Sequence, residues 1–138
     1  MGSTEEANKE IARRFLTQVL SQGDVDAARE LYAEDFEVWT AGSLPFSGSS
    51  NKTQALEGMS AVLGLFPKGL EFTVDALTAE GGRVAIEAHS DGVTAQGHRY
   101  QQTYHFLMEV RDGKITKFKE YMDTELARRV LVEGRAAD

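Results

Sequence analysis

The sequence predicts an α+β fold, because the spacing of its apolar residues changes midway along the chain. In the first half these residues recur every three or four positions, as on one side of a helix. From Leu70 onward they alternate, as in half-buried strands. Helices followed by a meander of antiparallel strands are typical of an α+β domain. We expect one domain over residues 1–138, with residues 1–3 and 133–138 frayed.

Helices dominate the chain before Leu70. We expect helices over residues 3–22, 24 to about 33 and 51 to about 66, with a short strand over residues 36–41. Gly23 ends the first helical pattern, and Asp24 is a favoured N-cap for the second. Asn51 and Gln54 have the spacing of a capping box, and Pro67 ends the third pattern. The Gly-, Pro- and Ser-rich segment between the strand and the third helix is expected to be a loop.

Strands dominate the second half. We expect strands over residues 70–79, 84–90, 99–110 and 115–123, and a closing helix from 123 or 124 to about 131. Tight turns at residues 80–83 and 111–114 contain glycine and join neighbouring strands. Residues 91–98 are expected to form a longer polar turn.

Composition limits the possible partners and surroundings. Lys and Arg number 15 against 22 Asp and Glu, for a net charge of −7, which is a poor match for nucleic acid or an anionic membrane surface. The chain has no cysteine, so a disulfide framework and a thiolate nucleophile are excluded. No apolar run approaches the roughly 18 residues of a membrane span, and no signal-peptide pattern opens the chain. We therefore expect a cytoplasmic protein.

Two acids near the end of the chain, Glu120 and Asp123, have different expected roles. Along the last strand Glu120 shares a face with Phe118 and Met122, whereas the other face carries two lysines. Glu120 is therefore expected to face the core, where burial raises the pKa of a carboxyl group toward neutrality. A carboxyl in that state can act as a general acid or base. Asp123 precedes a helical pattern and is expected to be its N-cap.

The preceding strand supplies neighbours for Glu120. One of its faces carries the larger rings and is expected to point inward: Tyr100, Gln102, Tyr104, Phe106 and Met108. Gln102 and Tyr104 are then polar groups in an apolar pocket, which is typical of a small-molecule site. The alternative is that both side chains satisfy Glu120 within a solid core that has no catalytic role.

The opposite face of the sheet carries further ionisable residues. Glu87, His89, Asp91 and His105 have no recognised metal-ligand spacing, so no metal is expected. Alternation places His89 and His105 on the outer face. Strand register is left open, because a single β-bulge would swap the faces and bring His89 and His105 inward.

Three segments resemble a known family. "GDVDAARELYAEDF" near the start, "RDGKI" in a late hairpin and "KEYMDTE" near the end are similar to the SnoaL-like branch of the nuclear-transport-factor-2-like superfamily, which also includes the ketosteroid isomerases. The resemblance covers nearly the whole chain. It implies a cone-shaped, cystatin-like α+β barrel: a curved antiparallel sheet wrapped around three N-terminal helices, with a short C-terminal helix and one deep pocket. It also implies a homodimer through the outer sheet face.

The resemblance assigns a role to Glu120 and leaves other positions unmatched. SnoaL-like polyketide cyclases and limonene-epoxide hydrolases carry an acid/base aspartate where this chain has Glu120. The helper histidine of the cyclases falls on Phe106. The remaining hydrolase residues fall on side chains of different chemistry: Val38, Thr40, Ala88 and Ser90. Of the ketosteroid isomerase residues only Tyr32 matches, because their base, second tyrosine and second acid fall on Thr40, Leu16 and Phe106.

These observations favour a cofactor-free acid/base enzyme of isomerase, cyclase or hydrolase type. Its substrate is expected to be an apolar, oxygenated small molecule, with Glu120 as the catalytic residue. Eleven further residues are expected to bind or enclose the substrate: Tyr32, Thr40, Gln102, Tyr104, Leu16, Met59, Leu63, Phe66, Phe106, Phe118 and Met122. Two alternatives stay open: a non-catalytic binding module that uses the same pocket, and an accessory dimeric domain with a filled core.

Overall fold

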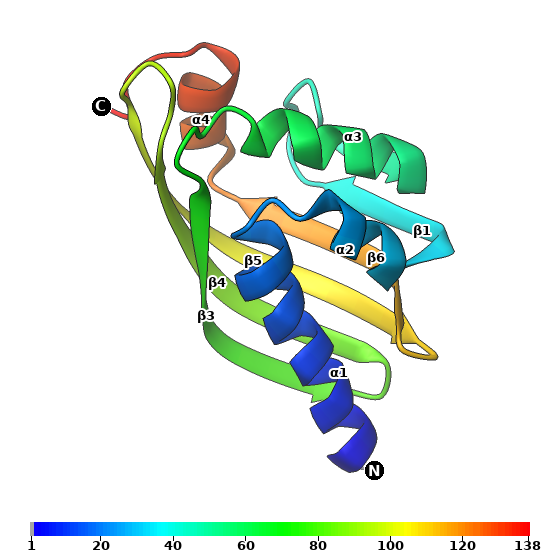
Figure 1. Ribbon diagram of the computed structural model, residues 1–138. Coiled ribbons are helices and arrows are strands. Elements are labelled where there is room, and N and C mark those ends of the chain that lie inside the picture. The colour runs from blue at the N-terminus through cyan, green and yellow to red at the C-terminus, as the bar shows by residue number, and fades with distance from the viewer. Residues whose placement is uncertain (1) are drawn as a thin grey trace.

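The computed structural model describes residues 2–138 and consists of a curved sheet with helices on its concave side (Figure 1). The helices are α1 (Gly2–Arg14), α2 (Val25–Leu31), α3 (Lys52–Leu63) and α4 (Thr124–Ala127), with π-helical turns η1 (Phe15–Leu20) after α1 and η2 (Arg128–Val132) after α4. The strands are β1 (Tyr32–Thr40), β2 (Gly48–Asn51), β3 (Leu70–Glu80), β4 (Arg83–Val93), β5 (Arg99–Arg111) and β6 (Lys114–Met122). The predicted α+β class is confirmed.

The six strands lie in the order β2-β1-β6-β5-β4-β3 and do not close into a complete barrel. Strands β3 to β6 form the expected antiparallel meander. The pair β1–β6 is parallel, which the meander pattern did not predict. A parallel pair needs a long crossover, and here α3 together with β3, β4 and β5 forms that connection. This pairing brings the early strand β1 directly beside the late strand β6.

The predicted helix caps are confirmed. The Asp24 carboxylate accepts a hydrogen bond from the Ala27 amide at 3.0 Å at the start of α2. Asn51 and Gln54 form a complete capping box at the start of α3. At the start of α4 the Asp123 carboxylate accepts from an amide of the first turn at 3.1 Å, so Asp123 has the structural role expected of it.

Several elements differ from their predicted extents, and α3 ends at Leu63 rather than near residue 66. Strand β1 begins at Tyr32 rather than near Phe36, because the chain leaves α2 in an extended conformation at that residue. Strand β2 lies in a segment expected to be a loop, since its Gly-Ser-Ser-Asn sequence carries no apolar alternation and pairing with β1 alone orders it. Strand β4 continues to Val93 through its pairing with β5, which shortens the predicted turn at residues 91–98.

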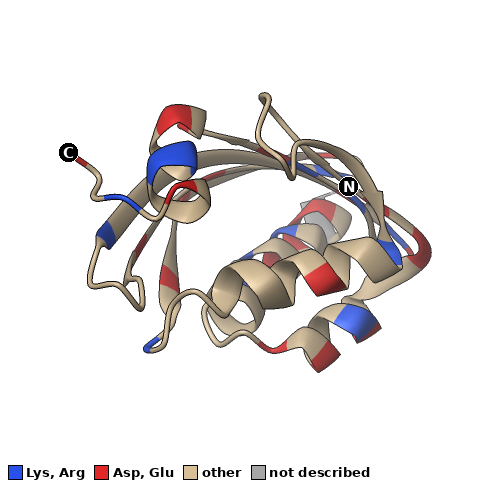
Figure 2. Ribbon diagram, turned by 90° about the horizontal axis from the view of Figure 1, so that it is seen from above, with Lys and Arg blue, Asp and Glu red and all other residues tan. Residues whose placement is uncertain are grey.

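The two faces of the sheet are the ones that alternation predicts. Val84 and Ile86 are buried on the concave face, whereas His89 and His105 are exposed on the convex face. Charges of both signs are interspersed along the helices and strands (Figure 2). On the convex face His89 pairs with Asp75 at 2.9 Å. The homodimer expected through this face stays a prediction.

The two ends of the chain complete the structure. Residues 2 and 3 belong to α1, and Met1 lies outside the described residues. Residues 133–138 form neither helix nor strand, and the Arg135 amide donates to the Arg129 carbonyl at 2.8 Å. Within residues 2–138 no helix combines the length and the apolar character needed to cross a membrane.

Candidate active site

A cavity of about 170 Å³ lies between the helices and the concave face of the sheet. Aromatic and aliphatic side chains from η1, α3 and strands β1, β3, β5 and β6 line most of it. Of the lining residues, Phe46, Gln54 and Gly58 are exposed, so they mark the opening beside α3. An apolar cavity with a few polar groups is the usual form of a small-molecule site.

Glu120 is the carboxylate of this cavity. Its backbone lies between Thr40 of β1 and Phe106 of β5 in the sheet register, and its side chain is half-buried and borders the cavity. Burial raises the pKa of Glu120 from its ordinary 4.5 to about 7, and a hydrogen bond from Thr40 opposes the rise. That bond, from Thr40 Oγ1 to Glu120 Oε1, is long at 3.4 Å. The carboxyl is therefore weakly held and retains capacity to bind a ligand.

Tyr32 contributes a second polar group to the same cavity. Its ring is buried and stacks on Phe36, with centroids 3.7 Å apart. Burial, and then the charge of Glu120, raises the pKa of the Tyr32 phenol, so the phenol stays protonated at neutral pH. The Lys52 ammonium donates to the backbone carbonyl of Tyr32, and the Tyr32 hydroxyl has no partner among residues 2–138. This hydroxyl can therefore donate to a ligand.

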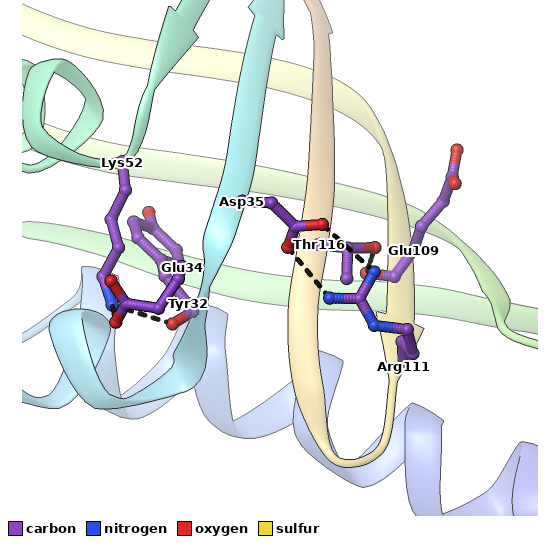
Figure 3. Close-up of polar contacts among 7 residues, drawn as sticks. All are labelled: Tyr32, Glu34, Asp35, Lys52, Glu109, Arg111 and Thr116. Atoms are coloured by element: carbon purple, nitrogen blue, oxygen red, sulfur yellow. Dashed lines mark hydrogen bonds and ion pairs between the residues drawn. The ribbon is translucent and has the colours of Figure 1, made fainter.

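Contacts outside the cavity hold the corner where Tyr32 begins β1 (Figure 3). Lys52 Nζ donates to the Tyr32 carbonyl at 3.0 Å and to Glu34 Oε1 at 3.1 Å. The Arg111 guanidinium of β5 donates two hydrogen bonds, of 2.9 and 3.2 Å, to the Asp35 carboxylate. The Arg111–Asp35 pair is exposed and contributes little stability by itself. Its geometric effect is to tie β1 to the end of β5, next to Tyr32.

Gln102 belongs to the core rather than to the cavity wall. Its amide nitrogen donates to Tyr100 Oη at 2.8 Å and to the Asp123 carbonyl at 2.9 Å. Its amide oxygen accepts from the backbone amides of Asp123 and Thr103 at 3.1 and 3.0 Å. The amide of this buried side chain thus donates two hydrogen bonds and accepts two, and those to Asp123 connect β5 to the end of β6.

Tyr104 borders the cavity, but its hydroxyl lies 2.8 Å from Ser90 Oγ and is engaged there. Neither Tyr104 nor Gln102 bonds to Glu120 in the described part of the chain. The alternative in which these two residues satisfy Glu120 within a solid core therefore does not describe the structure. The cavity takes the place that such a core would fill.

The structure brings most of the predicted site residues together around the cavity. The lining includes Glu120, Tyr32, Thr40, Met59, Leu63, Tyr104, Phe106, Phe118 and Met122. Leu16, Phe66 and Gln102 lie outside it. Leu16 is fully buried in the helix–sheet core, and the Phe66 ring packs on Tyr100 at 5.8 Å.

The π-helical turn brings Phe15 and Leu20 to one side of the helix. Both residues line the cavity, although residues five apart lie about 140° apart on an α-helix. The turn η1 has the wider i to i+5 bonding, shown by the Ser21 amide donating to Leu16 O at 3.1 Å. Leu16, on the same turn, is fully buried and does not line the cavity.

Other lining residues had weaker signals in the sequence. Val38 is two positions before Thr40 on β1, so strand alternation alone places it on the same face. Phe46, Ser50 and Gln54 also border the cavity, from the loop, β2 and the start of α3. No periodic pattern marks these three residues, because long-range packing alone brings their segments to the opening.

Comparison with known proteins identifies the family. The profile of the SnoaL-like domain matches residues 12–118. The chain belongs to the SnoaL-like domain family. The match ends two residues before Glu120, so it bears on the fold and the cavity walls rather than on this carboxyl. No curated protein sequence matches the chain.

Solved structures of this SnoaL-like fold are similar over most of the chain. A candidate SnoaL-like polyketide cyclase from Jannaschia sp. CCS1 has 20% identity and a TM-score of 0.77, covering 97% of this chain and 94% of its own. An NTF2-like protein from Anabaena variabilis has 25% identity and a TM-score of 0.76, with coverages of 86% and 90%. An LEH-like epoxide hydrolase from M. tuberculosis has 21% identity and a TM-score of 0.72, with coverages of 94% and 92%.

Proposed function

We propose that this SnoaL-like protein is an acid/base enzyme that acts on an apolar, oxygenated small molecule, with Glu120 as the group that gives and takes the proton. The observation that carries the proposal is the position of Glu120: a single carboxyl borders a mostly apolar cavity and has one long hydrogen bond. A carboxyl held this way retains acceptor capacity for a ligand.

The protonation of Glu120 suits this role. With its pKa raised to about 7 by burial, both the acid and the carboxylate are populated at neutral pH. A general acid or base works best when its pKa lies near the working pH, and such a group contributes about 10²- to 10⁴-fold to a rate. Tyr32 complements it, because a protonated phenol without a partner can donate to a substrate oxygen while Glu120 moves the proton.

Among the three reaction types, the polar groups beside Glu120 favour isomerisation or cyclisation over hydrolysis. Hydrolysis requires a water held next to the carboxylate by further polar groups. Thr40 already donates to Glu120, and its neighbour Val38 on the same face is apolar. The Tyr32 hydroxyl can hold a water, but the proposed mechanism assigns it to the substrate oxygen. Proton transfer within a substrate needs no such water. The similar structures include a candidate cyclase and an epoxide hydrolase, so the fold accommodates both outcomes.

Deuterium incorporation into simple ketones tests the proposal, whatever the natural substrate is. Small cyclic ketones incubated with the protein in D₂O are expected to exchange their α-hydrogens, measured by NMR, because a positioned base abstracts such protons. Glu120→Gln keeps the size of the side chain but cannot accept the proton, so exchange should fall at least about 100-fold. Glu71→Gln, an exposed position on β3, is the matched control and should leave exchange unchanged.

The competing function is a binding module that uses the same cavity. It is supported by the absence of a second carboxylate from the lining residues that the structure describes. A ketone that raises the melting temperature of wild type and of Glu120→Gln equally, with no exchange above the buffer rate in either, would establish binding without catalysis. Equal exchange rates in the two proteins would remove Glu120 from the mechanism.

A further inference from the structure

The volume of the cavity limits the size of the ligand more strongly than membership of the SnoaL-like family does. Its volume is about 170 Å³. An apolar cavity of about 150 Å³ in another protein accommodates benzene, so this one holds a single ring with short substituents, about six to ten non-hydrogen atoms. A four-ring steroid or a fused polyketide needs a much larger space. Most of such a molecule would therefore lie outside the opening unless side chains of the wall move.

The shape of the wall favours a ring. Three aromatic side chains on β5 and β6 stack in sequence: Phe118 lies 4.7 Å from Phe106, and Phe106 lies 4.8 Å from Tyr104, with interplanar angles of 26° and 19°. Phe72 of β3 continues the row beside Tyr104 at 5.5 Å. Rings stacked face to face leave their edges free, and the edge of one ring packs favourably against the face of another, so this row suits a cyclic ligand that lies across the ring edges.

The lining favours a neutral ligand, because a charged ligand of either sign would lose its hydration among mostly apolar walls. The described lining residues include no Lys, Arg or His, so an acid or phosphate ligand would face Glu120 without a counter-charge. The polar groups at Glu120, Thr40 and Tyr32 stand among apolar walls. One oxygen on the ligand is enough to engage them.

We propose that the substrate is a neutral, single-ring compound of about six to ten non-hydrogen atoms. Its oxygen is bound at Tyr32, the carbon next to that oxygen-bearing carbon lies at Glu120, and its ring lies along Phe106 and Phe118. The inference rests on the proposed function, which it narrows to one substrate class. Met59 of α3 lines the cavity and is assigned as a residue that sets the size limit.

Calorimetric titration with a graded series of ketones tests the size limit by binding alone. The series is cyclohexenone, acetophenone, anthrone and androstenedione, measured on wild type and on Glu120→Gln. Cyclohexenone and acetophenone are expected to bind at least about ten-fold more tightly than the two larger ketones, in both proteins. Cyclohexylamine and cyclohexanecarboxylate, which keep the ring and change the charge, are expected to bind more weakly than cyclohexenone to wild type at pH 7.

A pair of variants on α3 tests the wall. Met59→Ala removes a lining side chain and should improve anthrone binding at least about five-fold over wild type. Leu56→Ala is the matched control, because Leu56 is buried on the same helix but does not line the cavity. It should lower stability and leave the order of affinities unchanged.

The outcomes separate this inference from the proposed function. Size-limited binding without deuterium exchange would refute the proposed enzymatic activity and support the proposed ligand class. Exchange together with equal or tighter binding of anthrone or androstenedione would support the enzymatic activity and overturn the ligand class. Tighter binding of the amine or the carboxylate, or no binding by any member of the series, would also overturn it.

Discussion

Glu120→Gln is expected to stabilise the folded protein above neutral pH and to change its stability little below about pH 5. Burial raises the pKa of Glu120 to about 7 in the folded protein, whereas in the unfolded chain the carboxyl titrates near its ordinary 4.5. Between these values the folded state holds a proton that the unfolded state has released, so the free energy of unfolding falls as the pH rises. Above about pH 7 both states are ionised and the wild type bears the full cost of a charged carboxylate among apolar walls.

The size of the effect follows from the two pKa values. One pKa unit corresponds to about 1.4 kcal/mol, so the distance from 4.5 to about 7 corresponds to about 3 kcal/mol at high pH. Glu120→Gln removes this cost only in part, because the hydrogen bonds of the glutamine amide in the cavity are themselves incomplete. We expect a gain of about 2–3 kcal/mol in the free energy of unfolding at pH 8, roughly 10 °C in melting temperature for a domain of this size.

Urea unfolding followed by circular dichroism, at constant ionic strength and at several pH values from about 5 to 9, measures the gain. The difference between Glu120→Gln and wild type should grow across the interval between pH 4.5 and about 7 and then level off. Glu71→Gln, the exposed control, should show no comparable growth. A difference between Glu120→Gln and wild type that is the same at every pH would refute the argument that burial shifts this carboxyl.

Three further changes test the structure around the site. Thr40→Val removes the hydrogen bond that lowers the pKa of Glu120, so that pKa should rise further in a carboxyl-carbon NMR titration; an unchanged value would mean that the 3.4 Å contact is inert. Asp123→Ala removes the cap of α4 and should lower the free energy of unfolding by about 1 kcal/mol, measured in urea, without changing deuterium exchange. A loss of exchange as large as that of Glu120→Gln would instead make Asp123 catalytic. Gly42→Ala should lower the free energy of unfolding by more than about 1 kcal/mol, because φ is +91° and the added Cβ would lie 2.7 Å from the side chain of the first residue of α4. Gly48→Ala has a similar φ of +92° but open space around the Cβ, so its loss of stability should be smaller. Equal losses in the two variants would contradict the predicted steric clash at Gly42.

The sequence alone determined the features that depend on neighbouring residues. Asp24, Asn51 and Asp123 precede helical patterns, and each caps a helix because its side chain reaches an amide only three residues away. The alternation around Glu120 placed it on the concave face, because successive side chains of a strand point to opposite sides. The α+β class followed from the same local periodicities.

Only the tertiary structure decided which groups meet around Glu120. Thr40 lies 80 positions earlier and reaches Glu120 through the parallel pairing of β1 with β6, which no local pattern encodes. Gln102 was expected in the pocket, but the backbone of Asp123 satisfies its amide, because a buried amide takes the nearest complete set of partners. The tertiary structure also decided that a cavity remains open beside Glu120. Strand alternation says which side chains face inward, but the curvature of the sheet and the position of α3 decide whether those side chains fill the space between them.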